Sequence, residues 1–183
     1  MRVFVAIEIS DEVRAELART QQTLAVASAK VKWVAPENIH LTLKFLGDID
    51  EETAGPVRAA MAAAAGGGPF AFEVAGLGTF PPRGKPRVVW AGVTEGAQAA
   101  TRLQAKLEAA LRPLGFRAEK RFVPHLTLGR VKSPKGADEL MARIEGHAGA
   151  AFGTCSAAEM TLFQSTLTPQ GAVYRVVAKQ ALA

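Results

Sequence analysis

The tetrapeptide His-Leu-Thr-Leu occurs twice in this chain of 183 residues, beginning at His40 and again, nearly half the chain later, at His125. The two copies use two of the three histidines, and a proline, Pro36 or Pro124, precedes each of them closely. One histidine in an apolar strand is usually a structural residue of the core. Because the same four residues recur, we interpret the two copies as a pair with a shared role.

In a β-strand, residues i and i+2 face the same side, about 6.6–7 Å apart. His40 and Thr42 would therefore point one way, and the leucines between and after them would point into the core. If the strand of His125 and Thr127 lies beside the first, two imidazoles and two hydroxyls converge in one cleft. Threonine hydroxyls can donate to phosphoryl oxygens, and histidine, with an ordinary pKa of about 6.5, can accept or donate a proton near neutral pH. This arrangement suits a phosphodiester.

A metal site is the main alternative use of paired histidines. Neither motif has a Cys, Asp or Glu beside it at ligand spacing, and Cys155 is the only cysteine. We therefore expect no metal and no other cofactor, and the single thiol excludes an internal disulfide. The segment "GGGPF" lacks the Gly-Lys-Ser/Thr of a nucleotide-binding loop, so ATP use is not indicated.

Period-2 and helical patterns alternate along the chain and predict the elements that must position the motifs. Ser10 is expected to cap a helix that runs to about Ala27 with Val13, Leu17, Thr20 and Leu24 on its apolar face. Further helices are expected at 51–65, 97–111 and 137–146. Strands are expected at 1–9, 30–35, 40–47, 70–80, 87–93 and 125–131, and a closing hairpin at 158–167 and 172–182 around Pro169-Gln170-Gly171.

A loop followed by a His-Leu-Thr-Leu strand comes in each half of this order of elements. We therefore predict an α+β fold of two pseudo-symmetric lobes, each an antiparallel sheet with helices on one face, with a cleft between them. Each lobe is too small to be expected to fold alone, so we expect residues 1–183 to form a single bilobal domain.

The composition limits the class of protein. No segment approaches the roughly 18 uninterrupted apolar residues of a membrane span. The lone cysteine and the absence of a signal-peptide pattern lead us to expect a cytoplasmic protein. We also expect it to be a monomer. The net charge of +5 weakly favours a polyanionic partner.

Through these two motifs and the segments around them, the chain resembles the 2H phosphoesterase superfamily, and within it the bacterial and archaeal RNA 2′,3′-cyclic phosphodiesterases, also described as 2′-5′ RNA ligases. The resemblance covers almost the whole chain, through "MRVFVAIEIS", "VKWVAPENIHLTLKFLGDI", "RVVWAGV", "RFVPHLTLGRV" and "LFQSTLTPQGAVYRVV". It implies a cleft lined by the two motifs and hydrolysis of a 2′,3′-cyclic phosphate at an RNA end, or of a small cyclic nucleotide, to a 2′-phosphomonoester.

Carried onto this chain, the resemblance makes His40 the proton donor to the departing 3′ oxygen and His125 the acceptor that activates water. Thr42 and Thr127 would hold the phosphoryl oxygens. Arg130 matches a basic residue that would bind the phosphate, but strict strand alternation places it on the face opposite His125. A bulge at Gly129 would return it to the cleft.

For other side chains near the motifs, the sequence gives weaker indications of a role in the site. Lys44 follows the first motif without a glycine beside it, and we expect this charged side chain in solvent. Phe45, Phe122 and Tyr174 could stack on bases, but aromatic residues in strands usually pack in the core, and we expect the same here. The basic residues that could follow an RNA backbone are Arg83, Lys85, Arg87, Lys120 and Arg121.

Two other functions remain open. The same site permits reversible 2′-5′ RNA ligation if a 5′-hydroxyl replaces water as the nucleophile, although water at about 55 M favours hydrolysis. A non-catalytic module that only holds an RNA end is the other alternative. Turnover of a cyclic nucleotide separates an enzyme from such a module.

Overall fold

The structure is a computed structural model that describes residues 1–25 and 28–183. The α-helices within these residues are α1 (Asp11–Leu24), α2 (Glu51–Ala64), α3 (Ala97–Leu111) and α4 (Ala137–Gly146), and two short 3-10 helices are η1 (Pro36–Asn38) and η2 (Arg112–Leu114). The strands are β1 (Arg2–Ile7), β2 (Val31–Trp33), β3 (Leu41–Asp48), β4 (Phe70–Phe80), β5 (Val88–Val93), β6 (His125–Val131), β7 (Ala151–Ala157), β8 (Glu159–Thr168) and β9 (Gly171–Ala181).

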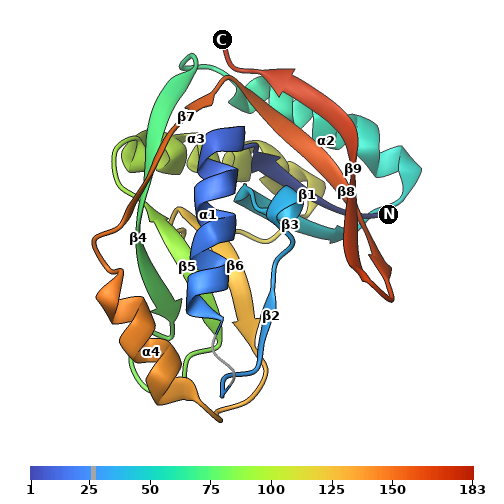
Figure 1. Cartoon of the computed structure of the whole chain (residues 1–183). Helices are drawn as coiled ribbons and strands as arrows, with labels where there is room; N and C mark the ends of the chain where they lie inside the picture. The colour runs from blue at the N-terminus through green and yellow to red at the C-terminus, as the bar shows by residue number, and fades with distance from the viewer. Residues whose placement is uncertain (26–27) are drawn as a thin grey trace.

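The described strands form two antiparallel sheets, which confirms the predicted α+β fold of two sheets with helices. One sheet has the order β3-β1-β8-β9, and the other has the order β2-β6-β5-β4-β7 (Figure 1). The first motif strand, β3, is at an edge of the four-stranded sheet. The second, β6, lies between β2 and β5 of the five-stranded sheet. The two motifs therefore belong to different sheets.

The two lobes do not coincide with the two halves of the chain. β1 and β3 enter the four-stranded sheet, but β2 and β4 from the same half pair with β6 and β5 in the other sheet. From the second half, β8 and β9 return to the four-stranded sheet beside β1. Each sheet thus takes strands from both halves, and neither half has a complete sheet of its own.

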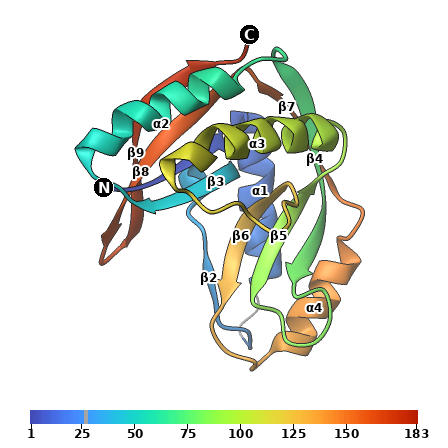
Figure 2. The ribbon, with the colours of Figure 1, turned by 180° about the vertical axis from the view of Figure 1, so that it is seen from behind.

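The helices form two pairs on opposite sides of the molecule. α1 packs on β7 and α4 on β4, both in the five-stranded sheet, and Figure 1 shows these two helices in front. α2 packs on β9, α3 on β3, and the two helices pack on each other; Figure 2 shows them in front, from the other side. Helices therefore cover each sheet, as the sequence predicts.

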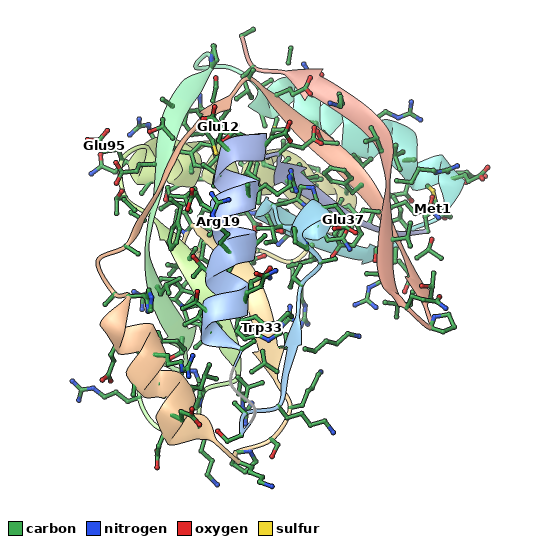
Figure 3. The ribbon with its side chains drawn as sticks, viewed as in Figure 1. Met1, Glu12, Arg19, Trp33, Glu37 and Glu95 are labelled. Carbon is green, nitrogen blue, oxygen red and sulfur yellow. The ribbon has the colours of Figure 1, made fainter. Side chains whose placement is uncertain are left out.

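The first helix begins as predicted and ends earlier. The Ser10 hydroxyl accepts a hydrogen bond from the Val13 backbone N–H at 3.3 Å, which is an N-cap. α1 ends at Leu24, and the last two residues of the predicted helix, 26–27, lie outside the described residues. The prediction for Thr20 is wrong: Gln21, not Thr20, is the buried polar residue on the inner face. The outer face carries exposed Glu12 and Arg19, both labelled in Figure 3.

The sequence patterns missed one strand, β7, at the edge of the five-stranded sheet. Its residues pair with Phe70–Ala75 of β4, yet only Phe152, Cys155 and Ala157 are buried along it. The segment consists largely of small residues, and Gly153 has a φ of 123°, a conformation that favours glycine. The sequence therefore lacks the period-2 pattern of a half-buried strand. Pairing with β4, not local preference, makes this segment a strand.

One continuous cluster of buried apolar side chains runs from β1 to Leu182 and includes residues of both sheets and of all four α-helices. Leu41, Leu43, Leu126 and Leu128, the leucines of the two motifs, belong to it and are 0–1% exposed. Because both sheets share this core, we propose that residues 1–183 fold as one bilobal unit. Within the described residues, no helix is long and apolar enough to cross a membrane.

Candidate active site

The two motif strands contribute to the same cavity. His40, directly before β3, and Thr42 within β3 line a cavity of about 680 Å³ together with His125 and Thr127 from β6. The motif leucines are buried in the core, as strand alternation requires, although Leu43 is also among the lining residues. The structure therefore brings together the four residues that the sequence singles out. The third histidine, His147, ends α4 and is not among the lining residues.

A β-bulge at the last residue of each motif changes which side chains face the cavity. In β6, Trp90 is opposite Thr127, but the next residue of β5, Val89, is opposite Gly129, so Leu128 is the extra residue. This confirms the bulge expected at Gly129, and Arg130 reaches the cavity lining. A side chain at position 129 would collide with Val31 and Trp33 of β2, because a Cβ there would be 2.7 Å and 2.8 Å from their atoms. Trp33 is labelled in Figure 3.

The bulge in β3 is at the equivalent place. Ala6 is opposite Thr42, and Val5 is opposite Lys44, so Leu43 is the extra residue. Phe45 consequently returns to the cavity side, at the position that corresponds to Arg130 in β6. Phe45 is 62% exposed and its ring centroid is 5.8 Å from that of Phe4. The prediction that Phe45 packs in the core is wrong, because the bulge changes its face.

His40 and His125 each make a hydrogen bond of the same kind. His40 Nδ1 is 2.9 Å from the Asn38 carbonyl oxygen, and His125 Nδ1 is 2.7 Å from the Val123 carbonyl oxygen. A carbonyl only accepts, so Nδ1 carries the hydrogen in both rings. Nε2 is then the nitrogen that remains to accept a proton from a reactant when the ring is neutral, or to donate one when it is charged.

The surroundings of the two histidines differ. His40 is 8% exposed and packs near the rings of Phe163, Tyr174 and Phe4, with centroid distances of 4.6 Å, 5.7 Å and 6.3 Å. Burial away from water is the main cause that lowers the pKa of His40, and the hydrogen bond to Asn38 opposes it. His125 is half-buried, with its ring edge-on to Phe80 at 5.0 Å.

The charge of nearby groups has a smaller effect on His40. The Arg14 guanidinium lowers its pKa further, and the Glu8 carboxylate raises it. Arg14 also donates to the carbonyl oxygens of Pro36 at 2.7 Å and Ile39 at 3.4 Å, so it holds the segment that leads into the first motif. The sequence did not indicate this role, because no pattern predicts such a contact for an arginine beside the apolar face of a helix.

Two further polar residues support the site and were also missed. Buried Gln21 of α1 donates to the Leu128 carbonyl oxygen at 2.9 Å and to the Val34 carbonyl oxygen at 2.7 Å, which ties the bulge of β6 to the segment after β2. Asn38 donates to the Ala172 carbonyl oxygen at 2.7 Å and so ties the loop before His40 to the β8–β9 hairpin. The position of Gln21 on the apolar face of α1 could have indicated from the sequence that this polar side chain is buried and hydrogen-bonded.

The remaining cavity wall is aromatic and basic. Phe80, Phe122, Tyr174 and Trp90 line it together with Arg121, Arg130 and one acidic residue, Glu119. The other basic residues that the sequence indicated as an RNA track, Arg83, Lys85, Arg87 and Lys120, are exposed but not among the lining residues. Of that set, only Arg121 is in the cavity. Within the described residues, no three His, Cys, Asp or Glu side chains gather as a possible metal site.

Comparison with known proteins agrees with the repeated motif. The family model for LigT-like phosphoesterases matches this chain twice, at residues 7–90 and 92–174, so that each match contains one His-Leu-Thr-Leu motif. The RNA 2′,3′-cyclic phosphodiesterase of Methanothermobacter thermautotrophicus is 38% identical over 175 residues, which are 95% of this chain and 95% of that protein. The protein of the same name from Thermotoga maritima is 35% identical over 181 residues and covers 97% of this chain and 93% of its own.

Solved structures share the fold over the full length. TT0787 of Thermus thermophilus superposes with a TM-score of 0.84 at 32% identity and covers 100% of this chain and 98% of its own. Escherichia coli LigT, solved in complex with 3′-AMP, has a TM-score of 0.78 at 24% identity, covers 99% of this chain and 97% of its own, and shows the same fold. With two full motif repeats, a shared cavity and relatives at this level of identity, the chain belongs to the LigT-like phosphoesterase family of 2H phosphoesterases.

Proposed function

We propose that this protein hydrolyses 2′,3′-cyclic phosphates at RNA ends, or on small nucleotides, to 2′-phosphomonoesters by metal-independent acid–base catalysis. The observation that carries the proposal is the matched orientation of His40 and His125. Each ring donates through Nδ1 to a backbone carbonyl two residues earlier, and both rings line one cavity with a threonine beside each. Two such nitrogens facing one substrate are what a phosphodiester needs, one to take a proton and one to give a proton.

In the proposed reaction, water attacks phosphorus and the bond between phosphorus and the 3′ oxygen breaks. His125 Nε2 takes a proton from the attacking water, and His40 Nε2 gives a proton to the departing 3′ oxygen. Thr42 and Thr127 donate to the non-bridging oxygens, and Arg130 binds their negative charge. The products are a 2′-phosphomonoester and a free 3′-hydroxyl, and the two histidines have exchanged protonation states.

The cavity supports a nucleotide substrate. Its volume of about 680 Å³ falls within the roughly 300–1,000 Å³ that is typical of small-molecule sites. The wall offers aromatic faces to a base and two arginines to a phosphate, and the bulge positions place Phe45 and Arg130 at corresponding points of the two motif strands. Because one of these residues is aromatic and the other is basic, the otherwise symmetric site would bind the nucleobase on the side of Phe45 and the phosphate on the side of Arg130.

Hydrolysis has more support than the alternatives. The curated relatives named above are called phosphodiesterases, which favours an enzyme over a non-catalytic RNA-end module. Ligation by the same site would require a 5′-hydroxyl to replace water, and the higher effective supply of water favours hydrolysis. We further propose that the protein acts as a monomer in the cytoplasm. Sedimentation of the purified protein tests the first of these, and fractionation of the cells that produce it tests the second.

Chelation should leave the activity unchanged. The protein is incubated with a 2′,3′-cyclic nucleotide in excess EDTA, and the product is identified by phosphorus NMR. We expect a 2′-phosphomonoester at the same rate as without chelator, because a side chain is available for each proposed catalytic role. A loss of turnover that one divalent metal restores would contradict the mechanism and favour a metal site. Binding of substrate with no product would favour the non-catalytic module.

The pH dependence of kcat/KM should be bell-shaped, with its acid limb below about 6.5, the ordinary histidine pKa. On the acid side, the rate falls when both His40 and His125 are protonated, because no neutral imidazole is then left to act as the base. Burial lowers the pKa of His40, so the doubly protonated form appears only at lower pH. In the profile of kcat, the limb should move upward, because the bound phosphodiester anion stabilises both imidazolium ions. Rates measured from pH 4 to 9 test this. An acid limb above 6.5 for kcat/KM would contradict the proposed effect of burial.

A further inference from the structure

Lys44 is a buried lysine that the proposed reaction does not use. It lies two residues after Thr42 in β3, and its side chain is only 4% exposed, so the prediction that it lies in solvent is wrong. Its ammonium group donates to Glu108 Oε1 of α3 at 2.7 Å and to the Arg117 carbonyl oxygen at 2.6 Å. The Glu119 carboxylate is 3.9 Å away. A buried ammonium group is costly unless it is paired and hydrogen-bonded in this way.

The Glu108 carboxylate joins several parts of the chain. Besides Lys44, its Oε1 accepts from the Gln104 side chain at 3.1 Å and from the Glu119 backbone N–H at 3.2 Å. Gln104 is itself 5% exposed. The cluster of Lys44, Glu108 and Gln104, which we call the buried cluster, therefore holds two backbone groups of one loop, the Arg117 carbonyl and the Glu119 N–H.

This loop, residues 115–124, connects η2 to the second motif strand and runs beneath α3 to the start of β6 (Figure 2). Four of its residues, Glu119, Arg121, Phe122 and Val123, line the cavity. Val123 also supplies the carbonyl oxygen to which His125 Nδ1 donates. The segment that the buried cluster holds therefore ends at the group that orients the second histidine.

The pseudo-symmetry of the fold does not require a cation at this position. The residue that corresponds to Lys44 after the second motif is Gly129, which Val31 and Trp33 of β2 cover closely. On the β3 side, no strand of the described residues covers the equivalent place, since β3 is the edge strand of its sheet. The loop and α3 cover it instead, and their contact is made through charge and hydrogen bonds.

We propose that Lys44 is a positioning residue: through Glu108 and the Arg117 carbonyl, it fixes the loop 115–124, and with it the orientation of His125 and the cavity wall that carries Arg121 and Phe122. The first motif strand thereby sets the geometry of the second motif. The inference deepens the proposed function, because it names a residue that prepares the proposed base, and its physical content can be measured without turnover.

The test variant is the double substitution Lys44→Met with Glu108→Leu. Lys44→Met alone would leave the Glu108 carboxylate buried without its cation, whereas removal of both charges leaves an apolar contact of similar volume and is commonly tolerated. Lys106→Met is the matched control. Lys106 is also a lysine, on the same helix as Glu108, but it is exposed, donates to the Gly66 carbonyl oxygen and does not line the cavity.

Three measurements apply to both variants. Native-state trypsin digestion reports the loop, because Arg117, Lys120 and Arg121 are exposed cleavage sites within it; cleavage at Arg58 of α2 reports global unfolding. Nitrogen NMR of the histidine rings reports which nitrogen of His125 carries the hydrogen. Turnover of a 2′,3′-cyclic nucleotide reports the catalytic geometry, which a shift of about 1 Å can change by about 10²-fold.

In the double variant, we expect cleavage within the loop to become at least about 10-fold faster with cleavage at Arg58 unchanged, which corresponds to loss of about 1.4 kcal/mol of local stability. The neutral His125 ring should become a mixture of tautomers, and kcat/KM should fall about 10–10²-fold. Lys106→Met should match the wild type. Unchanged loop cleavage and an unchanged His125 tautomer in the double variant would overturn the inference, whatever its turnover. If the wild type instead fails to turn over substrate, only the proposed function is refuted.

Discussion

Substitution of either motif histidine with alanine should lower kcat/KM on a 2′,3′-cyclic nucleotide by about 10²–10⁴-fold, which is the usual contribution of a positioned acid or base. His40→Ala removes the proposed acid, and His125→Ala removes the proposed base. A backbone carbonyl holds each ring in one orientation, so neither histidine can take over the role of the other without turning its ring. Initial rates at several substrate concentrations separate kcat from KM.

The two roles can be separated with a substrate whose leaving group needs no proton. On a nitrophenyl phosphodiester, the defect of His40→Ala should shrink, because the nitrophenolate departs without protonation. The defect of His125→Ala should persist, because water must still be activated. Burial lowers the pKa of His40 and so favours its neutral form in the free protein, which means that the bound phosphodiester anion has to raise this pKa for His40 to act as the donor. This substrate therefore tests the assignment that the family resemblance implies.

His147→Ala is the matched control, because this histidine hydrogen-bonds to the Arg143 carbonyl oxygen at 2.8 Å and does not line the cavity. Its activity should equal that of the wild type. If the activated leaving group rescued His125→Ala but not His40→Ala, the two roles would be exchanged. If neither variant lost at least about 10²-fold on the cyclic nucleotide, acid–base catalysis by this pair would be abandoned.

The second large effect should come from the threonines. Thr42→Val and Thr127→Val each remove one hydroxyl and should lower kcat by about 10–10³-fold, at or below the roughly 10²–10³-fold loss that follows removal of a single donor to a developing negative charge. Both side chains line the cavity, and neither hydroxyl has a hydrogen-bond partner among the described residues, so both are available to a phosphoryl oxygen. The loss should be smaller than for either histidine, because the other threonine and Arg130 still contact the phosphate.

Serine variants control for the change in shape. Thr42→Ser and Thr127→Ser keep the hydroxyl and lose only a methyl group, so they should recover most of the activity that valine removes. Thermal unfolding of all four variants should stay close to that of the wild type, because both threonines face the cavity and not the core. Equal losses in the serine and valine variants would show that the methyl group, and not the hydroxyl, matters at these positions.

The sequence by itself was sufficient to predict the chemical pairing and the local elements other than β7. Period-2 patterns place the motif leucines on one face and His40, Thr42, His125 and Thr127 on the other, and this depends only on strand geometry. The repetition of the tetrapeptide indicated a pair, and both copies line one cavity. The bulge that brings Arg130 into the cavity was also predictable, because Gly129 marks it.

The tertiary structure alone decided which residues surround that pair. Lys44 and Phe45 were both assigned to the wrong environment, because the bulge at Leu43 has no glycine to mark it and depends on the register with β1. The burial of His40 depends on Phe163 and Tyr174, far later in the chain, which reach it because β8 and β9 join the four-stranded sheet beside β1. Local patterns report which face of a strand a residue occupies. They do not report which distant segment covers that face, and this contact sets the burial, the pKa and the orientation of each group in the site.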